Sequence, residues 1–276
     1  MLKSIIKRVL LTVLKPLVRL LGEDIQPDPT HENRRKLCHV GGHYTSAGNI
    51  EFEDVRFHLS YPTFENILVE NLYFENYNFP LKGSWAVFDI GANAGATCIW
   101  FARQDNVKKI YAFEPVKPTC KMLHDNLALN PRLQNKVEVF PFGLGAERET
   151  IKIPFHRDHV MSLSSRGTFD SCFEPESVEE IQVEIAHQTI EPLLRKHQDD
   201  RVFLKVDCEG AEYEILPDLA EAGLLKEVDV LIVEWHDGDF QKIVSLLEAE
   251  HFFCFIEWHR RDKWKIGIIK AVKQTL

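Results

Sequence analysis

From Trp85 to the C-terminus, short apolar runs alternate with stretches whose apolar residues have helical spacing. Five of the runs have no polar face, so each is predicted to be a parallel strand that is covered on both sides. They span residues 86–91, 109–115, 136–143, 202–210 and 229–236, and the helical stretches between them span residues 94–103, 118–129, 211–222 and 240–250. This βαβ series predicts a doubly wound α/β fold.

Further strands are predicted near the C-terminus and in the middle of the chain. Residues 252–258 and 265–272 are apolar runs joined by a short polar link, which indicates an antiparallel hairpin at the end of the sheet. Residues 149–155 and 179–186 are strand-like and flank residues 156–177, which have no periodicity. A loop of that length in a compact domain is usually functional or disordered.

The first part of the chain has a different pattern. Residues 23–48 are polar and contain prolines and glycines, which predicts a linker. Residues 50–61 alternate loosely, as a strand or hairpin does, and residues 64–77 have helical spacing. We therefore divide the chain into an N-terminal helix (1–22), a linker and cap region (23–80) and the α/β domain (81–276).

The N-terminal helix is expected to be amphipathic and basic. Residues 2–21 place their lysines and arginines on one half of a helical wheel and their aliphatic residues on the other. The apolar run is too short to span a bilayer, and no small-residue cleavage site follows it. Two interpretations stay open: peripheral contact with an anionic membrane, or docking on a protein surface.

Composition narrows the function classes. The chain is 45% hydrophobic and 27% charged, which is ordinary for a globular protein. Its formal charge is −9, and because residues 1–22 hold five basic and no acidic residues, the remainder carries −14. An acidic body argues against a nucleic-acid partner. Six scattered cysteines without zinc spacing indicate reduced thiols and a cytoplasmic location.

The first motif with chemical meaning lies at the end of the first strand of the α/β domain. Asp89, Gly91, Asn93 and Gly95 form a tight turn that opens a helix, at the end of a parallel strand where such sheets bind ligands. Glycines there let the backbone approach a ligand closely. By itself, a glycine-rich turn is weak evidence.

A carboxylate at the end of the next strand makes the pattern more specific. Glu114 is placed to accept hydrogen bonds from both hydroxyls of a ribose. Dinucleotide enzymes share that acid, but their loop has a glycine where this chain has Asn93. Asp89 before the turn favours a ligand with an ammonium group and disfavours a pyrophosphate. S-adenosylmethionine (SAM) has the ammonium and the ribose and no phosphate.

Five motifs in order give the chain a family resemblance. They are Asp89-x-Gly-x-Asn-x-Gly95, Ala-Phe-Glu-Pro at 112–115, Leu123-x-x-Asn126-x-x-x-Asn130, Leu-Lys-Val-Asp-Cys-Glu-Gly-Ala-Glu at 204–212 and Glu-Trp-His at 234–236. Over residues 85–236 the chain resembles the FkbM family of SAM-dependent methyltransferases. The resemblance implies a class I methyltransferase fold, Rossmann-like, with a seven-stranded sheet, so residues 81–276 would be the methyltransferase domain. It also implies methyl transfer to oxygen, often a sugar or polyketide-like hydroxyl.

The resemblance also implies roles for the motif residues. Asp89, Gly91, Asn93 and Gly95 would line the methionine end of the cofactor. Glu114 would bind its ribose, with Pro115 beside it. Phe142 and Gly143 follow the third strand, where such folds touch adenine; Phe142 would stack on the ring or pack in the core. Residues 1–80 and 149–188 match less clearly, and we expect them to determine the substrate.

The catalytic candidates follow the last two parallel strands. Lys205 and Asp207 lie two residues apart, as do Glu234 and His236, so each pair shares a face. A lysine in a buried strand needs a partner, which Asp207 or Glu234 can supply. Three interpretations of these candidates stay open. Asp207, Glu234 and His236 bind Mg²⁺ or Mn²⁺, or His236 or Asp207 acts as a general base without a metal. In the third, structural interpretation, the charged residues brace the ends of the strands.

We therefore expect O-methylation of a small molecule, glycan or lipid-linked saccharide. A nucleic-acid methyltransferase on the same fold is the main alternative, disfavoured by the acidic body. An NAD-binding oxidoreductase is disfavoured by Asn93 and Asp89. The acceptor, the oligomeric state and the use of a metal are left open by the sequence.

Overall fold

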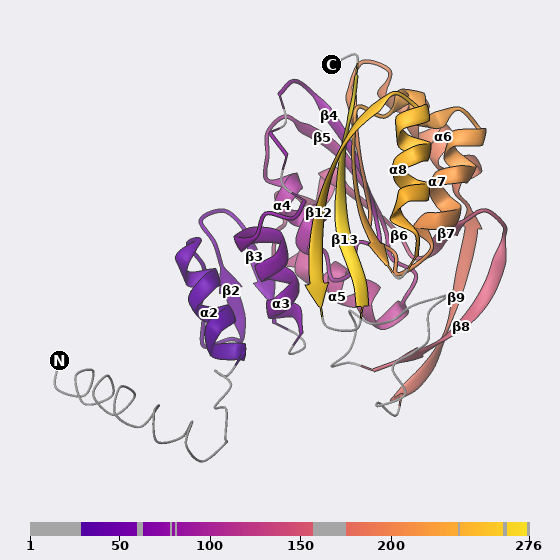
Figure 1. Ribbon diagram of the computed structural model, residues 1–276. Coiled ribbons are helices and arrows are strands. Elements are labelled where there is room, and N and C mark those ends of the chain that lie inside the picture. Colours follow the sequence, from indigo (N-terminus) through magenta and orange to yellow (C-terminus); the bar gives the residue numbers. More distant parts are fainter. Residues whose placement is uncertain are drawn as a thin grey trace, which may run out of the picture.

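The computed structural model describes residues 29–59, 63–77, 79–80, 82–156, 175–236, 238–261 and 264–274. Its centre is a seven-stranded sheet in the order β12-β13-β11-β10-β4-β5-β6 (Figure 1). The strands are β4 (Trp85–Ile90), β5 (Val107–Phe113), β6 (Val137–Phe140), β10 (Arg201–Val206), β11 (Val230–His236), β12 (Phe252–Arg261) and β13 (Trp264–Lys273). β13 is antiparallel to both neighbours, whereas the pairs from β11 to β6 are parallel. The predicted fold class, terminal hairpin included, is confirmed.

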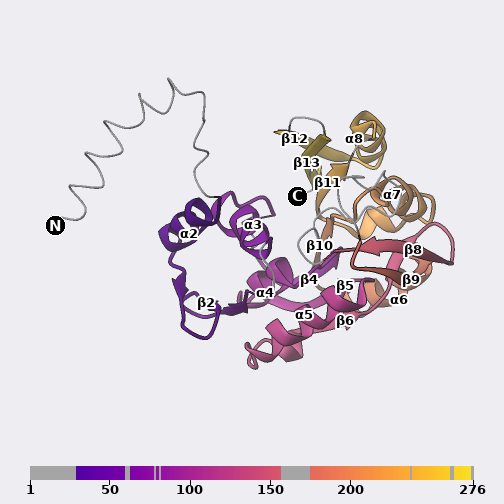
Figure 2. The same ribbon diagram turned by 90° about the horizontal axis from the view of Figure 1, so that it is seen from below.

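Helices cover both faces of this sheet. One face carries α6 (Ala186–Leu194), α7 (Glu212–Glu221) and α8 (Phe240–Ala249). The other carries α4 (Ala96–Ala102) and α5 (Lys117–Ala128) together with the N-terminal elements (Figures 1 and 2). The helix starting at 186 is absent from our expectations, because its residues follow directly on a strand-like pattern.

Strand residues alternate between the two cores, which explains why the runs lack a polar face. Phe203 of β10 and Ile232 of β11 belong to the core beside the N-terminal elements. Leu204 and Val233, one position on, belong to the core under α6, α7 and α8. The position after Phe203 on the same face is Lys205, so this face carries a charge at its carboxyl edge. The polar site begins there.

Residues 29–59 and 63–77 form a cap on the Lys205 face of the sheet, not a linker. They comprise α2 (Pro29–His39), β1 (His43–Tyr44), β2 (Asn49–Glu51), β3 (Arg56–His58), α3 (Phe64–Leu68) and the π-helical turn η1 (Val69–Tyr73). The linker prediction for residues 23–48 is therefore wrong from Pro29 to His39. The segment resembles a linker because it is mostly polar. The helix α2 packs on the protein through one buried leucine, Leu37, which is 0% exposed. The strand or hairpin predicted over residues 50–61 is present as β2 and β3. The helix predicted over residues 64–77 is present as α3 and η1, which end at Tyr73.

Two asparagines of the third motif fasten the cap to the α/β domain. Asn126 Oδ1 accepts the His58 amide of β3 at 2.7 Å, and Asn126 Nδ2 donates to the Ala94 carbonyl at 2.9 Å. Asn130 bonds both backbone groups of Arg56, at 2.9 and 2.7 Å. The motif thus ties the turn after β4 to the cap through one buried side chain.

A small second sheet lies beside the carboxyl ends of the parallel strands. Its strands are β7 (Gly143–Gly145), β8 (Glu149–Phe155) and β9 (Ser177–Ile185), in the order β7-β9-β8. The strands predicted at 149–155 and 179–186 are confirmed, while most of the aperiodic stretch between them lies outside the described residues. Short turns η2 (Gln134–Lys136), η4 (Arg195–His197) and η5 (Leu224–Glu227) complete the fold.

The predicted N-terminal helix, residues 2–21, lies outside the described residues, so its membrane or docking role stays a prediction. Within the part that the structure describes, no helix is both long and apolar enough to cross a bilayer.

Replacing Asn126 by alanine is expected to loosen the cap. Asn126 is fully buried, and its loss leaves the His58 amide and the Ala94 carbonyl without these partners. We expect the free energy of unfolding to fall by ~2 kcal/mol, measured by urea denaturation. The exposed Gln241→Ala change on α8 is the control, expected within ~0.5 kcal/mol of the unmodified chain. Equal stability of both variants would contradict this role.

Candidate active site

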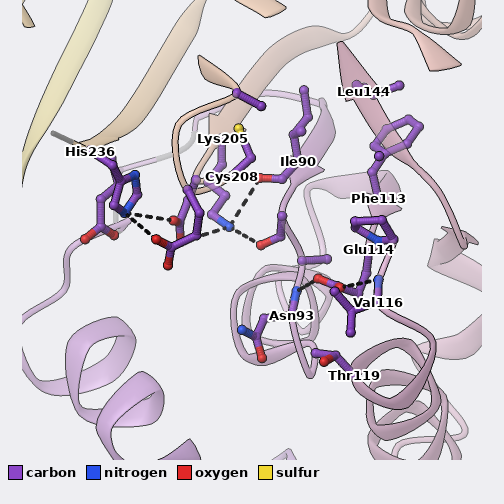
Figure 3. Close-up of a pocket in the computed structure, with 18 of the residues that line it drawn as sticks. Ile90, Asn93, Phe113, Glu114, Val116, Thr119, Leu144, Lys205, Cys208 and His236 are labelled. Atoms are coloured by element: carbon purple, nitrogen blue, oxygen red, sulfur yellow. Dashed lines mark hydrogen bonds and ion pairs between the residues drawn. The ribbon is translucent and has the colours of Figure 1, made fainter. Parts of the chain in front are cut away.

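A pocket lies at the carboxyl ends of the parallel strands, between the cap and the small sheet. Figure 3 shows Lys205 and His236 on one side of it and Glu114 and Val116 on the other. The turn after β4 and residues of η1, β8 and β9 complete its wall. Besides those four, lining residues include Tyr77, Ile90, Gly91, Asn93, Phe113, Pro115, Gly143, Leu144, Ile151, Ile181, Asp207, Glu209 and Glu234.

The glycines of the turn after β4 are required by the protein's own packing. Gly91 has a φ of 79°, and a Cβ on it would lie 1.7 Å from the Asp207 carbonyl oxygen. Gly95 has a φ of 88° and faces Leu123, whose Cγ a Cβ would approach to 3.2 Å. Gly91 lines the pocket and Gly95 does not. Close contact between the ends of β4 and β10 therefore accounts for Gly91 without any ligand.

Glu114 is held rigidly at the pocket wall. Its Oε2 accepts the Asn93 amide and its Oε1 accepts the Val116 amide, both at 2.9 Å. Burial raises the pKa of Glu114 to about 7, although the two amides act to lower it. Each carboxylate oxygen has two lone pairs, so both retain a position for a ligand hydroxyl.

Lys205 joins the ends of β4 and β10 through a buried ion-pair network. Its side chain is 2% exposed, and its Nζ lies 3.1 Å from Asp89 Oδ1 and 3.4 Å from Asp207 Oδ2. It also donates to the Gly91 carbonyl. Burial would lower the pKa of Lys205, but Asp89 and Asp207 raise it further than burial lowers it, so the ammonium stays charged.

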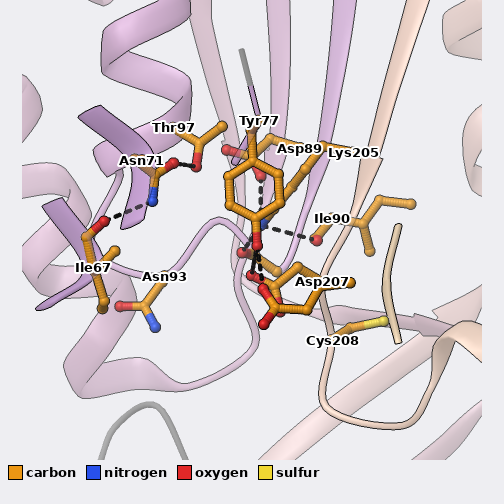
Figure 4. Close-up of polar contacts among 12 residues, drawn as sticks. Ile67, Asn71, Tyr77, Asp89, Ile90, Asn93, Thr97, Lys205, Asp207 and Cys208 are labelled. Carbon is orange, nitrogen blue, oxygen red and sulfur yellow. Dashed lines mark hydrogen bonds and ion pairs between the residues drawn. The ribbon is translucent and has the colours of Figure 1, made fainter. Parts of the chain in front are cut away.

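Tyr77 brings the cap into this network. Its hydroxyl lies 2.9 Å from Asp207 Oδ2 (Figure 4). The same hydroxyl also hydrogen-bonds Glu234 Oε2. The Lys205 ammonium lies 5.2 Å from the centre of the Tyr77 ring. Burial raises the pKa of Tyr77 well above its usual value, and Asp207 and Glu234 raise it further. The phenol is therefore un-ionised at physiological pH.

His236 is surrounded by carboxylates. Its Nδ1 lies 3.3 Å from Glu212 Oε1, and its Nε2 lies 3.6 Å from Glu209 Oε2 and 4.0 Å from Asp207 Oδ1. Glu212 is fully buried and also accepts the amides of Gly210 and His236. Burial alone would lower the pKa of His236, but Glu212 and Glu209 raise it to about 10. The ring is therefore an imidazolium at neutral pH.

Two further carboxyl groups of the pocket, those of Glu234 and Glu209, have raised pKa values. Burial, reinforced by Asp207, raises the pKa of Glu234 to about 7. Burial also raises the pKa of Glu209 to about 8, against the opposing charge of His236. Glu209 has a φ of 53°, a left-handed backbone conformation uncommon outside glycine. The site therefore contains groups that exchange protons near neutral pH.

The structure places the predicted cofactor residues unevenly. Gly91, Asn93, Glu114, Pro115 and Gly143 line the pocket, whereas Asp89 is fully buried and does not. The Asp89 carboxylate lies 3.1 Å from the ammonium of Lys205, which does line the pocket. Contact between Asp89 and an ammonium group of the cofactor stays a prediction.

Phe142 also lies away from the pocket wall. Its ring packs edge-on against Phe113 at 6.0 Å and Phe140 at 5.6 Å between centroids. The structure thus favours core packing over adenine stacking for this residue. Leu144, Gly145 and Phe113 form the wall at that end instead.

The four catalytic candidates are brought together, but not as a metal site. Lys205, Asp207, Glu234 and His236 all line the pocket. No group of three metal-ligating side chains with a suitable arrangement occurs among the residues that the structure describes. Tyr77 hydrogen-bonds two of the proposed ligands, and Glu212 pairs with the third. The arrangement gives the metal alternative no support.

The sequence interpretation missed one residue of the site, Tyr77, and one pairing, that of Asp89 with Lys205. Tyr77 ends an apolar stretch, and no pattern distinguishes it from a core residue. Asp89 as the partner of Lys205 follows only from the register, which pairs the two residues on adjacent strands.

Comparison with known proteins decides the family. A family model described as "Methyltransferase FkbM domain" matches residues 89–254, more than half of the chain. The chain belongs to this family. The resemblance carried by the five motifs is thereby confirmed, and membership of the FkbM family identifies the chain as a methyltransferase.

Individual relatives of this FkbM-family chain are distant. Methyltransferase sdnD of Sordaria araneosa is 25% identical over 189 residues, which cover 60% of this chain and 73% of that protein. A methyltransferase FkbM from Methylobacillus flagellatus KT has a TM-score of 0.49 and 17% identity, over 73% of this chain and 47% of that one. Precorrin-6y C5,15-methyltransferase from Geobacter metallireducens GS-15 has a TM-score of 0.41 and 15% identity, over 80% of this chain and 96% of that one.

The charge state of His236 is directly measurable. Since its pKa is raised to about 10, we expect the imidazole nitrogens to give imidazolium signals in a ¹⁵N NMR spectrum at pH 8. The stabilising contribution of this charge is complete below pH ~6.5, the pKa of an unperturbed histidine, and is lost as the pH rises through about 10. His236→Gln identifies the signals. Neutral-imidazole signals at pH 8 would show that the surrounding carboxylates do not hold the proton.

Proposed function

We propose that the chain transfers a methyl group from SAM to a hydroxyl of an acceptor molecule. The observation that carries this proposal is the combination of two features in one pocket. Glu114 presents a fixed carboxylate at one end, and the Asp207, Tyr77 and Glu234 cluster lies at the other.

The residues at the Glu114 end fit the adenosyl part of SAM. Each oxygen of Glu114 has capacity for one ribose hydroxyl. Phe113, Val116 and Leu144 supply apolar surface beside it, as an adenine ring requires. The carboxylates at the opposite end favour the positive charges of the cofactor over a pyrophosphate. When bound, SAM supplies an electrophilic methyl group on a cationic sulfur.

The opposite end is suited to orienting a hydroxyl. Asp207 lines the pocket, is 26% exposed and lies 3.4 Å from the Lys205 ammonium, so its carboxyl group can accept a hydrogen bond from an acceptor. Displacement at a methyl group depends mostly on alignment, and a fixed carboxylate supplies both orientation and a proton acceptor. His236 is positively charged and is not available as the base; its ring nitrogens lie 3.6 Å from Glu209 and 3.3 Å from Glu212.

The acceptor is proposed to be a small molecule, a glycan or a lipid-linked saccharide. The pocket wall carries several carboxylates, namely Glu70, Glu149, Asp207, Glu209, Glu214 and Glu234, whereas Lys205 and His236 are committed to ion pairs. Such a wall repels phosphates, which disfavours a nucleic acid. Cytoplasmic location and membrane contact through residues 2–21 remain proposals.

Glu114→Gln tests the cofactor assignment. The amide cannot accept both backbone amides and both ribose hydroxyls, so we expect at least tenfold weaker binding of S-adenosylhomocysteine (SAH), measured by calorimetric titration. Because the pKa of Glu114 is raised to about 7, binding by the unmodified chain should also weaken below pH 7.

The matched control for this experiment is Glu221→Gln, an exposed change at the end of α7. It should bind SAH as the unmodified chain does. Equal affinity in Glu114→Gln would overturn the ribose assignment, and no binding by the unmodified chain, with or without Mg²⁺, would overturn the cofactor.

A further inference from the structure

The hydrogen bonds of Tyr77 require a proton that the phenol does not supply. Its hydroxyl oxygen is within hydrogen-bond distance of Asp207 Oδ2 and of Glu234 Oε2. A phenol carries a single hydrogen, so it donates to only one of the two carboxyl groups. The other contact is attractive only when that carboxyl group is itself protonated and donates to the phenol oxygen. The geometry therefore fits three acidic groups that together hold two protons.

Neighbouring charges decide which carboxyl group is protonated. The Lys205 ammonium lies 3.4 Å from Asp207 Oδ2, so a positive charge faces this carboxyl group directly. Glu234 is buried and faces Asp207 and the carboxylate of Glu70 from η1, with His236 as the opposing positive charge on its own strand. Burial, Asp207 and Glu70 raise the pKa of Glu234 to about 7, although His236 and the hydrogen bond with Tyr77 act to lower it. The additional proton therefore lies on Glu234, and Tyr77 donates to Asp207.

We propose that Tyr77, Asp207 and Glu234 form a proton-holding cluster that loses one proton when the cationic cofactor binds and regains one from the acceptor hydroxyl during methyl transfer. The proposal rests on the proposed function, since it concerns the same pocket. A positive sulfur in the pocket favours the ionised form of Glu234, and the neutral sulfur of SAH does not. The proton position of the cluster is thus vacant more often while a transferable methyl group is present.

The transfer step balances without another reactant. The acceptor oxygen forms its bond to the methyl carbon, and the bond from sulfur to that carbon breaks with its electron pair remaining on sulfur. The hydroxyl proton passes to Asp207. Tyr77 then relays a proton from Asp207 to Glu234 by accepting at its oxygen and donating its own hydrogen. The sulfur loses its positive charge in the same step in which the cluster gains a proton.

The test needs no acceptor. Calorimetric titrations of the full chain with SAM and with SAH, each in two buffers of different ionisation enthalpy, give the number of protons released on binding. At pH 7 we expect SAM to release about half a proton more than SAH, since about half of the free protein then holds the Glu234 proton. The difference should vanish by pH 9. Contributions from Glu114 cancel, because both ligands contain the ribose.

Two substitutions assign the effect. Glu234→Gln cannot release the proton, so the difference between SAM and SAH should be lost. Glu209→Gln is the matched comparison, because Glu209 is a second carboxyl group in the pocket with a raised pKa, of about 8. The difference should persist in this variant. Tyr77→Phe removes the bridge and should shift the pH midpoint of the difference. Circular dichroism verifies that each variant is folded.

Each outcome has a definite meaning. Equal proton release with SAM and SAH in the unmodified chain, although both bind, would overturn the cluster and leave the methyltransferase assignment intact. If the difference between SAM and SAH were lost in Glu209→Gln and kept in Glu234→Gln, the released proton would come from Glu209, and the assignment to Glu234 would be wrong. Binding of neither ligand would overturn the proposed function together with the cluster.

Discussion

The site depends on one buried cation, the ammonium of Lys205. Leaving a charge of this kind unpaired inside a sheet is strongly unfavourable, so carboxylates must surround it. Asp89 on the neighbouring strand and Asp207 at the end of its own strand fulfil that requirement. Because the Gly91 carbonyl also accepts from Lys205, the turn after β4 is held against the end of β10. The position of the pocket wall follows from these contacts.

Neighbouring groups extend this constraint to the cap. Asp207 is fixed by Lys205, and Tyr77 reaches across from the cap to bond both Asp207 and Glu234. Asn126 ties the other end of the cap to the same turn after β4. The cap therefore helps to build the acceptor end of the pocket, whereas the Glu114 end is built by the α/β domain and the small sheet.

Sequence patterns predicted the α/β domain well because its strands are buried on both faces and its helices have a regular apolar spacing. They also located Glu114, Asp207, Glu234 and His236 on the pocket, since ends of parallel strands converge. The pairing of Lys205 with Asp89 depends on strand register, which periodicity alone does not give. Tyr77 was missed because it reaches the site through tertiary packing of the cap. The helix α2 was missed because its residues are mostly polar, and composition does not reveal which neighbours a side chain has. For Phe142 the sequence left stacking on adenine and packing in the core open for the same reason.

The account's central claim is that one pocket holds the cofactor ribose at Glu114 and the sulfur toward Asp207 and Tyr77. A crystal structure of the SAH complex tests it most directly. The account predicts both ribose hydroxyls within hydrogen-bond distance of Glu114 and the sulfur facing the Asp207, Tyr77 and Glu234 cluster. A ligand whose ribose lies away from Glu114, or whose sulfur points away from that cluster, would contradict it.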